Sequence, residues 1–155
     1  MRSITRRTAC AFAVAACIAM TEEAAAEATN LVATPEKPAS VSLPAPRTPN
    51  AVLLDRYMRA YAPPRRGSVE AVVSLGATGK EMEIGRFAVF PSEPFLAASP
   101  REQRAYRFDA SAAFAAFKDQ PLLVQLRLVP TDEAISPEGA KLTLSRVEVN
   151  PRPAN

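Results

Sequence analysis

The chain has 155 residues, a formal net charge of +3, two cysteines, and neither histidine nor tryptophan. Without histidine there is no imidazole for a Ser-His-Asp triad, a Cys/His zinc site or a histidine-ligated copper site. The positive charge is mild and dispersed, and no aromatic residues interleave with a basic stripe, which argues against nucleic-acid binding. The densest basic group, Arg56, Arg59, Arg65 and Arg66, is typical of a solvated helix face and loop, with a phosphate or lipid site as the alternative.

Residues 1–28 have the features of an export signal. Basic residues between Arg2 and Arg7 precede the uncharged, Ala-rich run Thr8–Met20, and the small residues of Ala24–Ala28 offer cleavage sites. The apolar run is shorter than the roughly 20 residues that a membrane-spanning helix needs. The sequence therefore predicts a cleaved signal peptide over residues 1–28 and a protein that is periplasmic or secreted.

Two alternatives stay open within this prediction. Val14-Ala15-Ala16-Cys17 fits a lipobox, in which Cys17 is lipidated and anchors the mature protein to the envelope, although the apolar run continues beyond it. Thr5-Arg6-Arg7 resembles a twin-arginine export signal. Both cysteines lie in this leader, so a mature chain that begins near Ala28 has no disulfide and no thiol nucleophile.

A proline-rich segment follows the leader. Residues 29–49 carry repeated prolines among Ala, Ser and Thr, which predicts a disordered linker. Residues 50–62 then show apolar side chains at helical spacing, with Asn50 as an N-cap and Pro63-Pro64 as a stop. This pattern predicts a short amphipathic helix that packs on the domain or, alternatively, binds a partner.

From Ser68 onward the apolar pattern changes to period two, which is typical of β-strands. Strands are predicted over Val69–Leu75 and Met82–Phe90, joined by the turn Gly76–Gly79. In the second strand the apolar side chains change parity at Gly85. A glycine at such a shift predicts a β-bulge.

The second half of the chain is predicted to continue the same sheet structure. A short strand at Tyr106–Phe108 precedes a brief helix over residues 110–117. Further strands are predicted over Leu122–Leu128 and Leu142–Val149, with another parity shift near Ser145. The strand spacing predicts a mainly β domain, a small antiparallel sandwich or barrel-like fold with one or two short helices.

This domain spans residues 68–150, and only its carboxylates are left as acid–base groups for catalysis. The candidates are Glu81, Glu83, Asp109, Asp132 and Glu133. Each has a structural explanation, such as an exposed strand edge for Glu81 and Glu83, or a helix cap for Asp109. The sequence therefore predicts a protein that is not an enzyme and uses no cofactor or metal.

Several segments of residues 68–150 resemble a known family. Gly85–Pro91 is similar to the K-F-D-V-F strand in the C-terminal β-sandwich domain of plant polyphenol oxidases, and bacterial tyrosinase-like proteins carry comparable domains. Arg86 stands for the Lys of that strand, whereas Ala88 replaces its Asp. The segments that follow in the family's order are Tyr106–Asp109, the Ala-rich turn to Phe117, Leu122–Pro130 and Leu142–Val149.

In that family the sandwich packs over a dicopper site held by histidines, and one of its side chains can plug the entrance. Because this chain has no histidine, the resemblance implies a free-standing interaction domain that covers or assists a separate tyrosinase-like copper enzyme. Phe95, in the proline-rich loop 91–104, is the candidate partner contact, with a place in the domain's own core as its alternative. The second hypothesis is a generic envelope binding domain of unknown ligand, which reaches a membrane only if Cys17 is lipidated.

Overall fold

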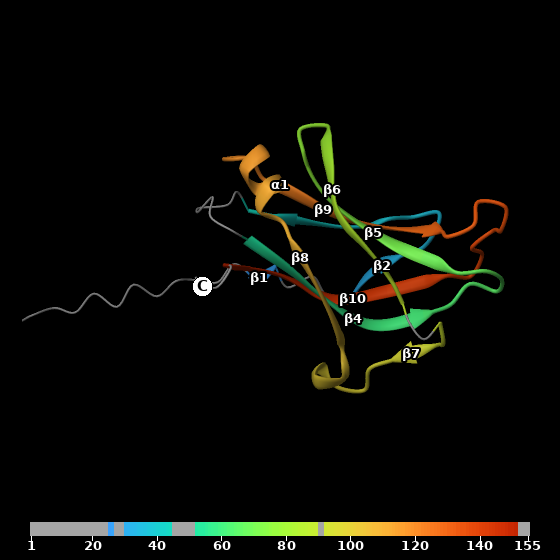
Figure 1. Cartoon of the computed structure of the whole chain (residues 1–155). Helices are drawn as coiled ribbons and strands as arrows, with labels where there is room; N and C mark the ends of the chain where they lie inside the picture. The colour runs from blue at the N-terminus through green and yellow to red at the C-terminus, as the bar shows by residue number, and fades with distance from the viewer. Residues whose placement is uncertain (1–24, 27–29, 45–51, 90–91, 152–155) are drawn as a thin grey trace, which may run out of the picture.

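The computed structural model describes residues 25–26, 30–44, 52–89 and 92–151 (Figure 1). Within them the chain forms two antiparallel β-sheets that share one hydrophobic core, which confirms the predicted mainly β sandwich. Sheet A has six strands and sheet B has four. Alternate residues of both sheets turn toward the core, as the pleat of a β-strand requires.

Sheet A is centred on two long paired strands, β4 and β10. Its strands are β1 (Ala25–Ala26), β2 (Leu31–Ala33), β4 (Val52–Ala62), β7 (Phe95–Leu96), β8 (Arg104–Asp109) and β10 (Lys141–Pro151). β7 and β8 pair with the second edge of β4, whereas β1 and β2 pair with the second edge of β10. β4 therefore lies in the interior of this sheet.

Sheet B has the strand order β3-β9-β5-β6. Its strands are β3 (Ala39–Leu43), β5 (Val69–Ala77), β6 (Lys80–Ala88) and β9 (Leu122–Pro130). The helical elements of the described residues are α1 (Ser111–Ala116) and the 3-10 turn η1 (Pro100–Glu102). Asp109 accepts a hydrogen bond from the Ser111 amide at 2.9 Å, so its carboxylate satisfies a backbone donor at the start of α1, as predicted.

At both predicted parity shifts the structure has an irregularity in the pairing between neighbouring strands. In β6 the pairing with β5 shifts at Ile84–Gly85, and in β10 the pairing with β4 shifts around Ser145. Gly85 has a second role, because a Cβ atom there would lie 2.6 Å from the ring of Phe108 on β8. The absent side chain thus lets β6 of sheet B approach β8 of sheet A.

The prediction of a helix over residues 50–62 is wrong, because Val52–Ala62 is the strand β4. The helical spacing came from two irregularities of that strand. Arg56 occupies the core-facing position between Leu54 and Met58, so a charged residue interrupts the apolar alternation. Arg59 then has no partner in the register with β10. Because of this extra residue, the buried side chain after Met58 is Tyr61, where simple alternation would place residue 60 in the core.

The prediction of a disordered linker over residues 29–49 is wrong for its described part, because β2 and β3 lie there. Both strands contribute to the core, through Ala33 and Leu43 among others. Pro38 and Pro44 flank β3 instead of interrupting it, so their missing N–H groups remove no hydrogen bond from inside the ladder. The folded domain therefore begins well before residue 68.

The predicted signal peptide lies largely outside the described residues, and so does Cys17. Ala25 and Ala26 are described, and they form β1 opposite Glu148 and Val147 of β10. Cleavage after Ala28 would remove this strand, whereas a mature chain that begins at Cys17 would keep it. Within the described part of the chain, no helix has the length and apolar character of a membrane span.

Candidate interaction surface

Charged and aromatic side chains gather on the outer face of sheet A, which is turned away from the core. Directly opposed residues of neighbouring antiparallel strands share a face. The register therefore places Asp55 between Arg107 and Glu148, and Tyr57 beside Arg146. We call this surface the A face and define it by Asp55, Tyr57, Arg59, Ala60, Leu96, Arg107, Lys141, Arg146 and Glu148.

Asp55 anchors one end of the A face. Its two carboxylate oxygens accept hydrogen bonds from Nε and Nη2 of Arg107, at 2.6 and 2.7 Å, and Asn150 Nδ2 donates a third at 3.1 Å. These bonds, above all those from Arg107, lower the pKa of Asp55 although burial opposes the shift. The Asp55 side chain is only 3% exposed, so a fixed carboxylate orients the more exposed guanidinium of Arg107.

Tyr57, Arg146 and Glu148 form a second fixed group beside it. Tyr57 Oη donates to Glu148 Oε2 at 2.9 Å, and Arg146 Nε lies 3.1 Å from Glu148 Oε1. The Arg146 guanidinium also stacks over the Tyr57 ring, with its Cζ 3.9 Å from the ring centroid. Burial, helped by the neighbouring Glu148 carboxylate, raises the pKa of Tyr57, so the phenol stays protonated and keeps donating.

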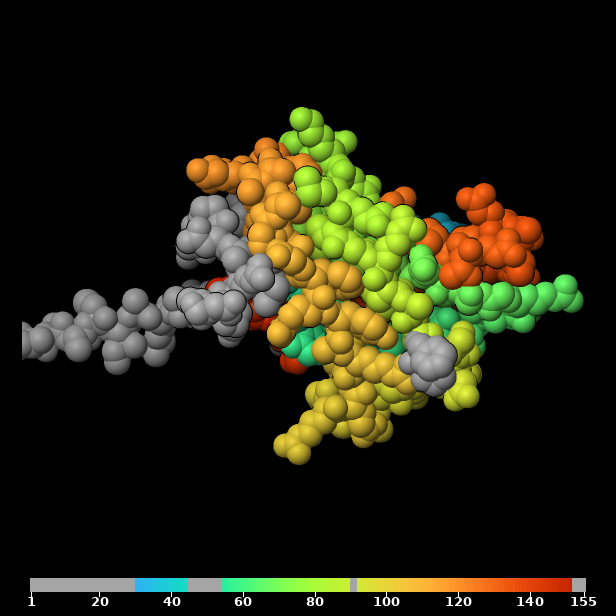
Figure 2. All heavy atoms as spheres, in the orientation of Figure 1, coloured from blue at the N-terminus to red at the C-terminus, as the bar shows by residue number. Residues whose placement is uncertain are grey.

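Leu96 supplies the large apolar side chain of the A face. It pairs with Ala60 in the β4–β7 ladder, and it is 73% exposed. The Ala97 amide, which follows it, donates to the Arg59 carbonyl at 2.8 Å. β7 lies at the lower right of the molecule in Figure 1, and the gold segment around η1 that follows it projects downward in Figure 2. Leu96 is thus presented to solvent by a hydrogen-bonded backbone.

Phe95, the partner contact predicted from the sequence, points to the other side of β7. It packs against the core, and the guanidinium carbon of Arg104 lies 4.4 Å from its ring centroid. Within the pair of apolar residues, Leu96 carries the exposed surface. Sequence reasoning missed Leu96 because only the pairing with β4 decides which of the two neighbours faces outward.

The outer face of sheet B, which we call the B face, has a different character. It is defined by Glu70, Glu81, Glu83, Arg86, Leu123 and Arg127. Arg86 donates to Glu83 at 2.7 Å, which lowers the pKa of Glu83, while Glu81 accepts from Ser74 and lies 3.6 Å from Arg127. Glu81 and Glu83 are therefore engaged with separate partners and do not form an acid–base pair.

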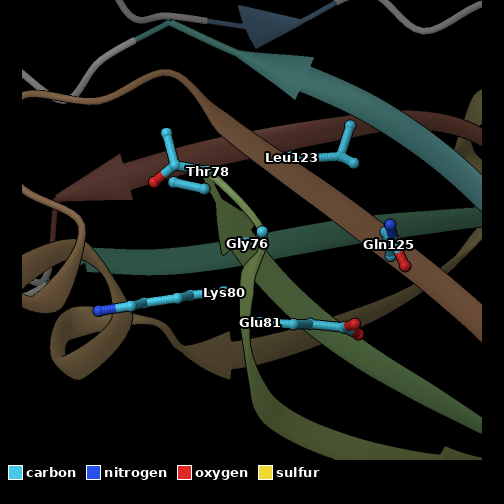
Figure 3. Close-up of a pocket in the computed structure, with 8 residues that line it drawn as sticks. Gly76, Thr78, Lys80, Glu81, Leu123 and Gln125 are labelled. Atoms are coloured by element: carbon cyan, nitrogen blue, oxygen red, sulfur yellow. The ribbon is translucent and has the colours of Figure 1, made fainter.

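A shallow hollow with a volume of about 210 Å³ lies at the end of the B face, over Gly76 and the β5–β6 turn. Thr78, Lys80, Leu123 and Gln125 contribute to its wall. Figure 3 shows Lys80 and Glu81 extending in opposite directions, so their charges do not converge on a common point. Ligand pockets are usually larger, on the order of 300–1,000 Å³, and combine an apolar lining with convergent polar groups.

Arg56 shows that the basic cluster expected from the sequence is not one surface. Arg56 is fully buried between the sheets, where its Nη2 donates to the Gln125 carbonyl of β9 at 3.1 Å and its Nε has no partner among the described residues. Burial lowers its pKa to about 9. Arg59 belongs to the A face, and Arg65 lies 3.5 Å from Glu138 in exposed loops. This dispersal leaves no phosphate site of the expected composition.

The described residues thus define a small β-sandwich with an organised outer face on sheet A. The part of the chain that the structure describes holds no group of three or more metal-ligating residues. No protein-family model matches the chain, and no curated protein matches it. The fold class therefore rests on the structure, and the resemblance to polyphenol oxidase C-terminal domains stays a prediction.

Proposed function

We propose that this protein is an exported, non-catalytic interaction domain that docks on another protein through the A face. The observation that carries the proposal is the fixed pair of Tyr57 and Arg146 on the same face as the exposed Leu96. A single exposed leucine is ordinary on a protein surface. Tyrosine and arginine, however, are the residue types that most often anchor protein interfaces.

The fixed geometry of this face supports the same proposal. Binding immobilises side chains, at a cost of about 0.5–1.5 kcal/mol for each flexible one. Arg107 is already oriented by Asp55, and Arg146 by Tyr57 and Glu148. A partner that contacts these guanidinium groups would therefore lose less entropy than one that contacts freely rotating side chains.

The proposed partner class is a tyrosinase-like copper enzyme, which this domain would cover or assist during maturation. Support comes from the resemblance of residues 68–150 to the domain that covers the dicopper site in polyphenol oxidases. The described chain adds a lobe that projects from the sandwich, formed by the segment around η1 that follows β7 (Figure 2). We place this lobe and the adjoining A face against the enzyme.

Co-expression with each tyrosinase-like enzyme encoded in the same genome tests this function. We expect one of them to co-purify in a fixed stoichiometry, and its diphenol oxidation to change when the domain is added or removed. The absence of a complex with every such enzyme at micromolar concentrations would contradict the tyrosinase assignment.

The alternative function is an envelope binding domain anchored through Cys17. One observation favours it, since β1 pairs with β10 and a chain that begins at Cys17 keeps this strand. Growth with a labelled fatty acid should then label the wild-type protein and leave a Cys17→Ala variant unlabelled. An unlabelled wild-type protein with a mature N-terminus beyond Cys17 would eliminate this alternative.

A further inference from the structure

We infer that the A face docks an acidic protein segment that also carries a large apolar side chain. This inference rests on the proposed function and adds the chemistry of the partner. The A face contains the cations Arg59, Arg107, Lys141 and Arg146 and the carboxylates Asp55 and Glu148. The exposed Asp109, at the end of β8, lies on the same side of the sheet, so four cations stand against three carboxylates there.

The carboxylates of Asp55 and Glu148 are already bound to cations of the same face, whereas that of Asp109 accepts a hydrogen bond from the Ser111 amide at the start of α1. Asp55 receives two hydrogen bonds from Arg107, and Glu148 lies 3.1 Å from Arg146 Nε. Lys141 is exposed, and Arg59 donates to the neutral amide oxygen of Asn30 at 3.0 Å. Neither of the two has a carboxylate partner among the described residues, so the field of the face toward solvent is positive.

The two oriented arginines make this charge specific for carboxylates. Arg107 uses Nε and Nη2 for Asp55, and Arg146 uses Nε for Glu148. The Nη1 group of Arg107 and both Nη groups of Arg146 donate to none of the described residues. A guanidinium held in one plane is well suited to receive a carboxylate, because it presents parallel N–H donors without further ordering.

An apolar strip adjoins these cations and determines the second property of the partner. The register aligns Leu96 with Ala60, then with Thr143 and Val32 on the next strands. These residues lie opposite one another across the sheet and therefore share its outer face. An occupant with a large apolar side chain beside its carboxylates would cover Leu96 while the arginines bind its charges.

The B face does not offer this complementarity. Its carboxylates Glu70, Glu81 and Glu83 lie near Arg86 and Arg127, so its three carboxylates outnumber its two cations. Its one large exposed apolar side chain, Leu123, is 36% exposed, half as much as Leu96. An acidic segment would therefore meet repulsion on the B face and attraction on the A face.

Titration of the ¹⁵N-labelled protein with a capped hexapeptide of sequence Glu-Asp-Leu-Phe-Asp-Glu tests the inference. We expect the amide signals of the A face to shift at peptide concentrations up to about 5 mM, where a site of millimolar affinity fills. The apparent affinity should fall about tenfold between low and high salt, because exposed charges are screened. A hexapeptide with lysine at the four acidic positions should cause no shift.

Charge-reversal variants give the matched control. Arg59→Glu combined with Lys141→Glu should weaken peptide binding at least tenfold, whereas Lys37→Glu with Lys80→Glu should change it less than twofold. Both double variants alter the net charge equally, and neither replaces a residue that bonds to Asp55 or Glu148. Equal losses in both variants, shifts centred on the B face, or no shift at about 5 mM peptide would each overturn the inference.

The test also separates this inference from the proposed function. If a tyrosinase-like enzyme co-purifies with the wild type and equally well with the Arg59→Glu, Lys141→Glu variant, the inference of an acidic partner segment is wrong and the proposed function stands. If the hexapeptide binds the A face as expected and no such enzyme co-purifies, the acidic docking surface stands and the enzyme assignment fails.

Discussion

The two outer faces of this sandwich use ion pairs in different ways. On the A face, the Asp55 carboxylate is 3% exposed and three hydrogen bonds from two side chains hold it in place. On the B face, Glu83 is 42% exposed and pairs with Arg86 three residues along the same strand. Water can replace the B-face pair with little change in energy, but it reaches Asp55 poorly. The comparison indicates that buried hydrogen bonds hold the charged side chains of the A face in fixed positions, whereas water surrounds the ion pairs of the B face.

Removal of one carboxylate from each face tests this difference, and Asp55→Ala should have the largest effect on stability. We expect it to lower the free energy of unfolding by about 2–3 kcal/mol, because hydrogen bonds to a charged group contribute about 1.5–3 kcal/mol. Glu83→Ala should leave the denaturation midpoint unchanged, because exposed pairs contribute little. Equal denaturant midpoints for the two variants would break the distinction between the faces.

Arg56 extends the comparison to the interior, one residue from Asp55. Its guanidinium is fully buried with one hydrogen bond and an unpartnered Nε. Replacement of a buried ion pair by apolar side chains of similar volume is often neutral or stabilising by about 1–4 kcal/mol, and Arg56 has no carboxylate partner to offset the cost of burying its charge. Arg56→Met should therefore raise the free energy of unfolding by about 1–2 kcal/mol, measured by urea denaturation. A loss of stability would show that the bond to the Gln125 carbonyl outweighs the cost of burial.

The lowered pKa of Asp55 predicts a smaller, pH-dependent effect. The unfolded carboxyl titrates near 3.8 and the folded one below that value, so the unfolded state binds more protons in this window. The stabilisation is complete above the unfolded pKa and is lost as the pH falls through the folded pKa. The wild-type urea midpoint should therefore fall more steeply than that of Asp55→Asn as the pH is lowered below about 4. Parallel pH profiles would contradict the account of Asp55.

Replacement of the two exposed leucines should also change the stability only slightly. Leu96→Asp and Leu123→Asp replace side chains at the surfaces of opposite faces. Each should change the free energy of unfolding by less than about 0.5 kcal/mol, which thermal or urea denaturation can verify. A larger loss in Leu96→Asp would mean that β7 depends on this side chain and would weaken its assignment as a docking contact.

The strands β5 and β9 were predictable because their apolar residues alternate, and β6 and β10 because theirs alternate on each side of a single parity shift. β9 is the clearest case, with Leu122, Val124, Leu126 and Leu128 all buried. The bulges near Gly85 and Ser145 were predictable for the same reason, since a parity shift is visible only against regular alternation. β3 of sheet B was missed, because it lies in the proline-rich segment that predicted a linker. β4 was not predictable, because its apolar residues do not alternate regularly. The charged Arg56 faces the core, and Arg59 is an extra residue in the register with β10.

The A face could not be predicted from local sequence, because its contacts join distant positions. Asp55 meets Arg107 across 52 residues, and Tyr57 meets Glu148 across 91. Such contacts depend on the register between strands, and the incorrect helix over residues 50–62 removed the strand on which that register is built. The sequence shows which residues are charged, but it does not show which of them lie inside the sandwich and which lie on its surface.

The binding of the acidic hexapeptide to Leu96→Asp and Leu123→Asp tests the central claim most directly. If the A face is the docking surface, Leu96→Asp loses the apolar contact and adds a repulsive charge. Its amide signals should then not shift at about 5 mM peptide, whereas Leu123→Asp should bind within twofold of the wild type. Unchanged binding by Leu96→Asp, or an equal loss in both variants, would contradict the claim that this face recognises a partner.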